Sequence, residues 1–399
     1  MTAYLLLIFF VCAFGAACFN AFTKNRSQRL PKTVFLSASF LALFACSALR
    51  HNIGYDYAMY AKGFALMRAE GFSNVAYLDW EWGFTILTKA IGLITGEVRI
   101  YMAAMALLCL AGPFCAILRH SKKAWLSVLL YINLYFFYCT MNFIRQSIAI
   151  SIVMFAYTFM VERKFWRFLL LVLLASSFHL TALIMVPVYF VINFKPSPKV
   201  PLMYAYLVLW VFISSDSTLD LLTGIIHSEY RDSVFLKLGL GAIHAVFPTL
   251  VVASGMFLLF RFVQPKDIAN FEKPVVMQTN LMYFSYLWIL IMLKHAIFER
   301  FSYYSYVFVI LYIPELIAFA DQKYKHHANI KFNKNLISPG MPEALQNQII
   351  SGYRKKGQLF NAILIFLVLL LSFAYNIYGL SAYDRGPHGI YPYATWING

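Results

Sequence analysis

Residues 165–194 read FWRFLLLVLLASSFHLTALIMVPVYFVINF, and their length decides how the chain crosses a bilayer. A crossing helix needs about 20 apolar residues, so the whole run is too long for one helix and each half is too short. Polar side chains from Ser176 to Thr181 lie at its centre, where lipid does not accommodate unpaired polar groups. The pattern predicts two half-helices that turn at His179 and return to the side from which they entered.

The composition is that of a membrane protein. The 399 residues are 61% hydrophobic and 13% charged, whereas soluble domains carry about 25% charged residues. We therefore expect one all-α polytopic domain over residues 1–399, with about 10–12 transmembrane helices including the re-entrant pair at 165–194. The first apolar segment, 3–22, lacks the basic region of a signal peptide and is predicted to be the first of these helices.

The positive charge supports the re-entrant interpretation. With that topology, six cytoplasmic segments hold 22 of the 33 Lys and Arg and only five acidic residues: 23–32, 119–123, 162–167, 195–199, 261–273 and 321–358. A single crossing at 165–194 would invert every later segment and place the basic 321–358 loop outside, against the positive-inside rule. Residues 50–98 and 216–242 are then extracytoplasmic, and 321–358 is expected to be a mobile connection. The net charge of +16 accompanies no nucleic-acid-binding motif, so no nucleic-acid partner is expected.

The sequence contains no recognisable metal-binding or cofactor-binding motif. The six cysteines lie in apolar segments without metal-ligand spacing, so we expect neither a metal site nor a disulfide framework, and no cofactor. Nucleotide-binding, serine-hydrolase and zinc-protease motifs are absent, and no pair of matching broken helices indicates a transporter's inverted repeat.

Ionisable residues gather on the predicted external side, many at helix ends: Arg50, His51, Asp56, Asp79, Glu81, Arg145, His179, His295, Glu299 and Arg300. Scattered charges would divide between the two faces. A cluster that faces one compartment predicts a site that opens there.

The arginines are candidates for binding an anion. Arg145 lies where two apolar segments meet, and a buried guanidinium needs an anionic partner: Asp56, Glu81 or a phosphate. Arg300 could pair with the adjacent Glu299 or face an anion from outside. Arg50 is held at the membrane edge, and a tight turn at Gly54 would bring Asp56 back toward it; the alternative is an interfacial arginine in an aromatic belt.

His179 and Glu81 are candidates for proton transfer. A histidine at the tip of a re-entrant pair can act as a base or donate to a phosphate, although it could also simply bond Ser176 or a carbonyl. Glu81 lies between Trp80 and Trp82, a pair that could serve only as an interfacial anchor.

These residues lie within short motifs that resemble a known family. The motifs are Arg50-x-x-Ile53-Gly54-x-Asp56-x-x-x-Tyr60, Glu81-x-Gly83-Phe84, Ile144-Arg145-Gln146, Phe178-His179-x-Thr181-Ala182 with Pro187, Glu299-Arg300-Phe301 and, in the tail, Pro392-Tyr393-x-x-Trp396. In order and spacing they resemble the EpsG family, the bacterial exopolysaccharide and O-antigen polymerases often called Wzy. The resemblance spans residues 50 to about 310 plus the tail.

The resemblance implies a multi-pass enzyme of the bacterial inner membrane whose site faces the periplasm or exterior. Such a glycosyltransferase transfers a glycan from undecaprenyl diphosphate to a sugar hydroxyl of another lipid-linked repeat unit. Arg145, Arg300 and Arg50 would bind the pyrophosphate, while His179, Asp56 and Glu81 are the catalytic candidates. The expected partners are lipid-linked oligosaccharides, the bilayer, a flippase and a chain-length regulator. The alternatives are a lipid-linked glycan flippase or transporter and a membrane-bound acyltransferase.

Overall fold

The computed structural model describes residues 2–22, 29–69, 79–195, 197, 199–214, 247–255, 273–292, 298–335, 343–382 and 387–396. Within these ranges the regular structure is helical, apart from one isolated β-bridge between Arg50 and Thr395. The prediction of an all-α polytopic membrane protein is confirmed.

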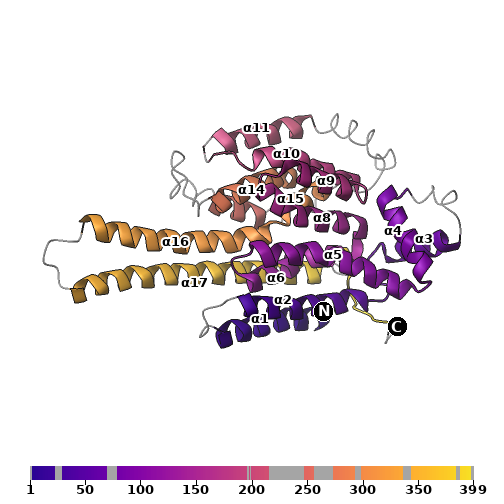
Figure 1. Cartoon of the computed structure of the whole chain (residues 1–399), viewed down its shortest axis with the longest axis horizontal. Coiled ribbons are helices and arrows are strands. Elements are labelled where there is room, and N and C mark those ends of the chain that lie inside the picture. Colours follow the sequence, from indigo (N-terminus) through magenta and orange to yellow (C-terminus); the bar gives the residue numbers. More distant parts are fainter. Residues whose placement is uncertain are drawn as a thin grey trace.

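The elements follow in chain order (Figure 1): α1 (Thr2–Phe22), α2 (Arg29–Ala48), α3 (Tyr57–Ala69), α4 (Trp82–Ile94), α5 (Val98–His120), α6 (Ala124–Asn133), α7 (Phe136–Asn142), α8 (Ile144–Val161), α9 (Phe165–Ser176), the 3₁₀ helix η3 (Leu180–Ile184), α10 (Met185–Val191), α11 (Lys199–Ile213), α14 (Lys273–Met292), α15 (Glu299–Tyr306), α16 (Val309–Asn335), α17 (Glu343–Ala382) and the 3₁₀ helix η7 (Pro387–Gly389).

In the described part, five helices are long and apolar enough to cross a membrane: Leu30–Ala48, Val98–His120, Ile144–Val161, Lys273–Met292 and Lys355–Ser381. Two bent pairs, α6 with α7 (51°) and α15 with α16 (43°), raise the number to seven if each pair is one span. Each of these two apolar runs of the sequence, 124–142 and 301–320, is therefore broken near its middle or its start. At the first break Tyr135 has a positive φ of 68°, a conformation that interrupts a right-handed helix.

The half-helix pair has the predicted hairpin form. The helix α9 ends at Ser176, and η3 and α10 follow after a break that contains His179. The ring of Phe165 lies 5.0 Å from that of Tyr189 and 5.6 Å from that of Phe190. Because the first residue of α9 contacts the last turn of α10, the chain turns at His179 and comes back.

The centre of the bundle is the contact between α5 and α8. A Cβ on Gly112 would lie 1.8 Å from the carbonyl oxygen of Ser151, so only glycine allows the two backbones to approach this closely. The Gly112 amide donates to the Ser151 hydroxyl at 2.8 Å. In Figure 1, α5, α6 and α8 occupy the middle, α1 and α2 one side, and α9, α10, α11 and α14 the other.

The predicted mobile connection at 321–358 is largely helical. The helix α16 continues to Asn335, and α17 runs unbroken from Glu343 to Ala382. The helix-breaking Pro339, Gly340 and Pro342 are confined to the short stretch between them, which lies outside the described residues. The two helices extend well beyond the rest of the bundle (Figure 1).

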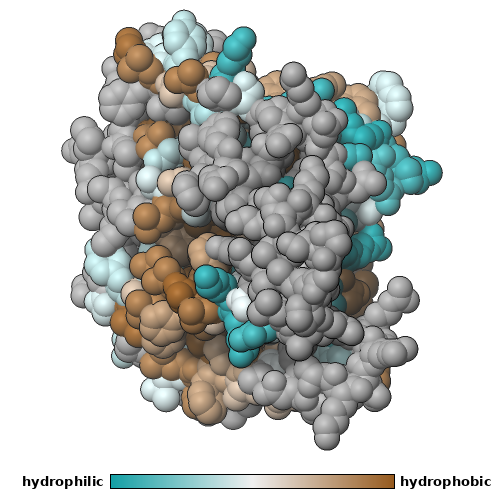
Figure 2. Space-filling view, turned by 90° about the vertical axis from the view of Figure 1, so that its left-hand side faces the viewer, coloured by the Kyte–Doolittle hydropathy of each residue, from teal (hydrophilic) through white to brown (hydrophobic). Residues whose placement is uncertain are grey.

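Large apolar side chains are exposed on the outside of the bundle, as expected for surfaces that face lipid. They include Trp166 and Leu170 on α9, Leu202 and Tyr206 on α11, and Leu359 and Phe366 on α17. Figure 2 shows extensive hydrophobic surface along one flank of the molecule. In water, an exposed apolar area of this kind would promote aggregation, whereas in a bilayer it is solvated by acyl chains.

The C-terminal segment packs against the connection between α2 and α3. The backbone amide of His51 donates to the carbonyl of Ala394 at 3.0 Å, and that of Trp396 donates to the carbonyl of Leu49 at 3.2 Å. The Tyr4 hydroxyl donates to the Ile390 carbonyl at 2.8 Å. Both chain termini therefore lie at the end of the bundle where α2 meets α3 (Figure 1).

The opposite end of α2 lies beside the other basic turns. Lys32 donates to the carbonyl of Ser121 at 2.9 Å, and Lys122 lines one hollow of the surface together with Asp321 and Gln358. The α5–α6 turn and the α16–α17 extension therefore share one end of the bundle.

This arrangement predicts which single cysteines an impermeant maleimide reaches from outside. In a cysteine-free background, Tyr55→Cys should be labelled, while Lys122→Cys, Lys195→Cys and Gln348→Cys, all exposed positions, should label only after permeabilisation. The reason is that the hairpin returns the chain to the side of the basic turns. Labelling of Lys195→Cys but not of Lys122→Cys would contradict the re-entrant topology.

Candidate active site

A close backbone approach joins α4 to the break in the hairpin. The Gly83 amide donates to the carbonyl of Ser177 at 2.9 Å, and a Cβ on Gly83 would lie 2.2 Å from the Ser177 hydroxyl oxygen. Only glycine fits there. Glu81, immediately before α4, is thereby held next to His179, which follows it by 98 positions in the sequence.

The Glu81 carboxylate binds two side chains at once. Its Oε2 accepts a hydrogen bond from Nη1 of Arg145 at 2.6 Å, and its Oε1 accepts one from Nδ1 of His179 at 2.8 Å. The side chains of Arg145, Glu81 and His179 are 20%, 16% and 15% exposed, so the charges meet in a mostly buried setting. These three residues form what we call the Glu81 triad.

The carboxylate of the triad stays ionised. Burial acts to raise the pKa of Glu81, but the hydrogen bond from His179 and the charge of Arg145 outweigh it and hold the pKa at about 2. At neutral pH Glu81 is therefore an anion that accepts from Nδ1 of His179 and fixes the orientation of the imidazole ring.

Two polar atoms of the triad lack a partner. Among the described residues, Nε2 of His179 and Nε of Arg145 are buried and make no hydrogen bond. Buried polar groups are normally satisfied, so unpaired atoms call for a ligand or a water molecule. Because Nδ1 of His179 donates to Glu81, Nε2 is the ring atom available for chemistry.

Arg300 lies on the neighbouring helix α15, which is tied to the site. Gln146 Nε2 donates to the Arg300 carbonyl at 2.6 Å, and the Thr181 hydroxyl donates to that of Tyr304 at 3.1 Å. The Arg300 guanidinium lies over the ring of Phe143 at 5.4 Å. The residue adjacent to Arg145 thus positions Arg300, and the structure brings the two arginines to one end of the bundle.

Asp56 faces these two arginines. Its backbone amide donates to Oδ1 of Asn142 at 3.0 Å. Burial raises the pKa of Asp56, and the charges of Arg300 and Arg145 oppose that increase. Asp56 thus lies within electrostatic reach of both cations.

The expected approach of Asp56 to Arg50 does not occur. The turn at Gly54 exists, with φ of 99°, but it packs against Met141, whose carbonyl oxygen would lie 2.3 Å from a Cβ. Arg50 is fully buried and donates to the carbonyl and hydroxyl of Ser47 at 2.5 and 2.8 Å. The turn therefore directs Asp56 toward α7 and α8 rather than toward Arg50.

The remaining sequence candidates take other positions. Glu299 accepts a hydrogen bond from the Tyr303 hydroxyl at 2.8 Å, and the carbonyl of Asp79 accepts from Arg145 at 3.4 Å. His295 lies outside the described residues. Within those residues, no three His, Cys, Asp or Glu side chains gather in a way that could hold a metal ion.

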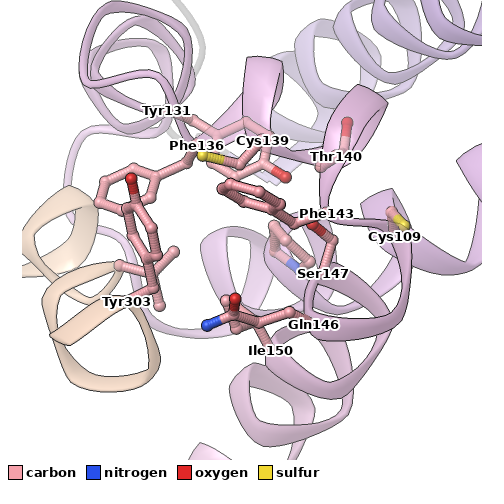
Figure 3. Close-up of a pocket in the computed structure, with 12 residues that line it drawn as sticks. Cys109, Tyr131, Phe136, Cys139, Thr140, Phe143, Gln146, Ser147, Ile150 and Tyr303 are labelled. Atoms are coloured by element: carbon pink, nitrogen blue, oxygen red, sulfur yellow. The ribbon is translucent and has the colours of Figure 1, made fainter. Parts of the chain in front are cut away.

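A small cavity lies beside the chain segment that carries Arg145. It measures about 20 Å³ and is lined in part by Phe143, Gln146, Thr140 and Tyr303 (Figure 3). That volume suits about one water molecule. Phe143 and Tyr303 give no functional signal in the sequence, because aromatic residues are common throughout its apolar segments; only the tertiary structure places them beside Arg300 and the cavity.

Comparison with known families gives a match over most of the chain. A model of the EpsG family matches residues 33–332. The chain belongs to the EpsG family. The match includes the whole Glu81 triad, Asp56 and Arg300, but not the tail. No curated protein and no solved structure matches the chain. Membership of the EpsG family, together with the membrane-spanning helices, indicates a multi-pass membrane protein of polysaccharide polymerisation.

The low pKa of Glu81 predicts an acid-dependent loss of stability. Its pKa falls from 4.5 to about 2 on folding, so its contribution is present above pH 4.5 and disappears as the pH falls toward 2. The stability difference between wild type and Glu81→Gln should be largest near pH 7 and shrink below pH 4.

Thermal unfolding of purified protein in detergent at pH 7, 5 and 3 measures this difference. Glu97→Gln is the matched control, because Glu97 also precedes a helix but is 64% exposed in a pair with Arg99. A difference between wild type and Glu81→Gln that does not change with pH would contradict the ionised triad.

Proposed function

We propose that this protein is a polysaccharide polymerase. It transfers a glycan from undecaprenyl diphosphate to a sugar hydroxyl of a second lipid-linked repeat unit, at the outer face of the bacterial inner membrane. The observation that carries the proposal is the Glu81 triad, whose unpartnered His179 Nε2 lies at an end of the bundle that also holds Arg145 and Arg300. The EpsG match supports the same reading.

The reaction needs a base and a means of stabilising negative charge. The bond between the anomeric carbon and the diphosphate oxygen breaks, and the acceptor hydroxyl oxygen forms the new glycosidic bond while losing its proton. The departing diphosphate carries additional negative charge, which arginines stabilise in a dry site.

His179 is the base in this proposal. Glu81 accepts a hydrogen bond from the Nδ1–H group of His179, which leaves the lone pair of Nε2 free to take the proton of the acceptor hydroxyl. The nearby carboxylate then stabilises the imidazolium that forms. Glu81 itself is a poor base, since its pKa of about 2 leaves it little affinity for a proton. Asp56, whose pKa is raised by burial, is the second candidate.

Arg145 and Arg300 bind the diphosphate in this proposal. Arg145 engages Glu81 through Nη1, and its Nε has no partner in the described part. Arg300 lies against Phe143, which limits the positions its guanidinium can take. Arg50 is fully buried and donates to Ser47, so in this proposal it stabilises the end of α2 rather than contacting the diphosphate directly.

The decisive experiment is a reconstituted reaction. Purified protein in liposomes should convert a lipid-linked repeat unit, isolated from a strain that lacks this gene, into polymer and release undecaprenyl diphosphate. A flippase would move the substrate without joining it, and an acyltransferase would need an acyl donor. If no polymer forms while the substrate is translocated or acylated, the proposal is wrong.

A flippase and a chain-length regulator are the partners we would expect in cells.

Arg145→Lys tests the diphosphate role. Lysine keeps the positive charge but lacks the planar fork that bonds Glu81 and a phosphate together, so polymer formation should fall by at least about 100-fold with normal protein levels. Arg119→Lys, which alters an arginine stacked on Phe155, is the matched control and should retain activity. Full activity in Arg145→Lys would show that the guanidinium geometry is not used.

His179→Gln tests the base. Glutamine can still donate to Glu81 but cannot take up a proton, so turnover should fall by about 10²–10⁴ while binding of the lipid-linked unit is retained. Ser176→Ala is the control, since that hydroxyl only donates to the carbonyl of Leu173. Turnover within about threefold of wild type in His179→Gln would remove His179 from proton transfer and leave Asp56 as the candidate.

A further inference from the structure

Three buried polar atoms near the tail have no hydrogen-bond acceptor or donor among the described residues. They are Nδ1 of His51, the hydroxyl of Tyr57 and Nε1 of Trp396. Burial raises the pKa of Tyr57, and the charge of Arg50 opposes the increase. The phenol is therefore neutral at pH 7, and its hydroxyl hydrogen lacks an acceptor among the described residues.

These atoms belong to one aromatic group. The His51 ring lies 4.0 Å from that of Trp396 and 6.3 Å from that of Tyr57. The guanidinium of Arg99 lies 5.3 Å from the Trp396 ring. We call His51, Tyr57 and Trp396 the tail aromatic group, because the tail carries Trp396 and its backbone bonds hold the group together.

Core packing alone does not account for this group. A purely structural aromatic cluster needs no N–H or O–H at its centre, and unpaired buried donors destabilise a fold. His51 and Trp396 are only partly buried, and the side chain of Arg99 is 59% exposed. Aromatic rings with unpaired donors at a partly open surface are suited to a ligand that has both apolar faces and hydroxyl groups.

We propose that the tail aromatic group is a carbohydrate subsite. The C–H face of a sugar ring would pack on Trp396 and His51, and its hydroxyl oxygens would accept from Tyr57 and Trp396. This inference rests on the proposed function, since it names a second sugar position for the same glycan. The subsite includes a tail residue beyond the range 33–332 that the EpsG model matches.

The subsite is connected to the Glu81 triad through α3. Tyr57 and Tyr60 lie one turn apart on the same buried face of that helix. The Tyr60 ring lies 5.7 Å from the ring of Trp80, which immediately precedes Glu81. A glycan whose reacting end lies at the triad would therefore place a following sugar against the tail aromatic group.

Direct binding tests the subsite without any transfer reaction. The probe is a set of oligosaccharides released by mild acid from the polysaccharide of the source strain, titrated calorimetrically into purified protein in detergent. Tyr57→Phe should weaken binding about fivefold, and Trp396→Ala about tenfold or more. Tyr57→Phe removes a hydroxyl without an acceptor, so its thermal stability should equal that of wild type.

Tyr101→Phe is the matched control. It removes a buried hydroxyl of the neighbouring core that already bonds Thr88 at 3.3 Å, so sugar binding should not change. Wild-type binding in Tyr57→Phe and Trp396→Ala, or no binding by the wild type at millimolar probe, overturns the subsite. If the variants lose binding while the wild type makes no polymer, the subsite stands and the proposed polymerase function fails.

Discussion

The carboxylate of Glu81 is the anion on which the arrangement of the site depends. Burying Arg145 without a counter-charge would be strongly destabilising. A buried ion pair between a guanidinium and a carboxylate is tolerated only when its geometry is good and further hydrogen bonds satisfy its remaining polar atoms. Glu81 meets that need with one oxygen and uses the other to orient His179. One interaction therefore fixes the position of a cation, the tautomer of a histidine and the contact between α4, α8 and the half-helix pair.

Glycines make these contacts possible. The backbone of α4 reaches the hairpin only because residue 83 has no side chain, and α5 reaches α8 for the same reason at residue 112. The charged residues of the site are therefore carried by closely packed helices. Close packing holds their side chains in place, so they need to move little when a substrate binds. Such preorganisation is the main way a protein lowers the barrier for a reaction that separates charge.

The two ends of the bundle differ in chemistry. One end gathers His179, Glu81, Asp56 and the arginines, together with the tail and the α2–α3 connection. The other carries basic turns and the long α16–α17 extension. The proposed reaction between two lipid-linked substrates is assigned to the first end, because the arginines and His179 lie there together. In the proposed mechanism, this one cluster of an EpsG-family protein supplies both anion binding and proton transfer.

The sequence by itself determined the membrane class, the all-α architecture and the hairpin at 165–194, because hydropathy and length act locally along the chain. It also indicated most of the charged residues of the site. Only the tertiary structure decided that Arg145 pairs with Glu81 rather than Asp56, that Arg50 is buried against Ser47, and that the tail returns to His51. Helix packing decides which polar side chains distant in sequence bond to each other. The apolar pattern of the sequence predicts where helices lie, but it does not predict which polar groups come into contact. The same holds for the 321–358 region: Pro339, Gly340 and Pro342 predicted a mobile connection, whereas α16 continues to Asn335, α17 begins at Glu343, and the two helices pack along each other.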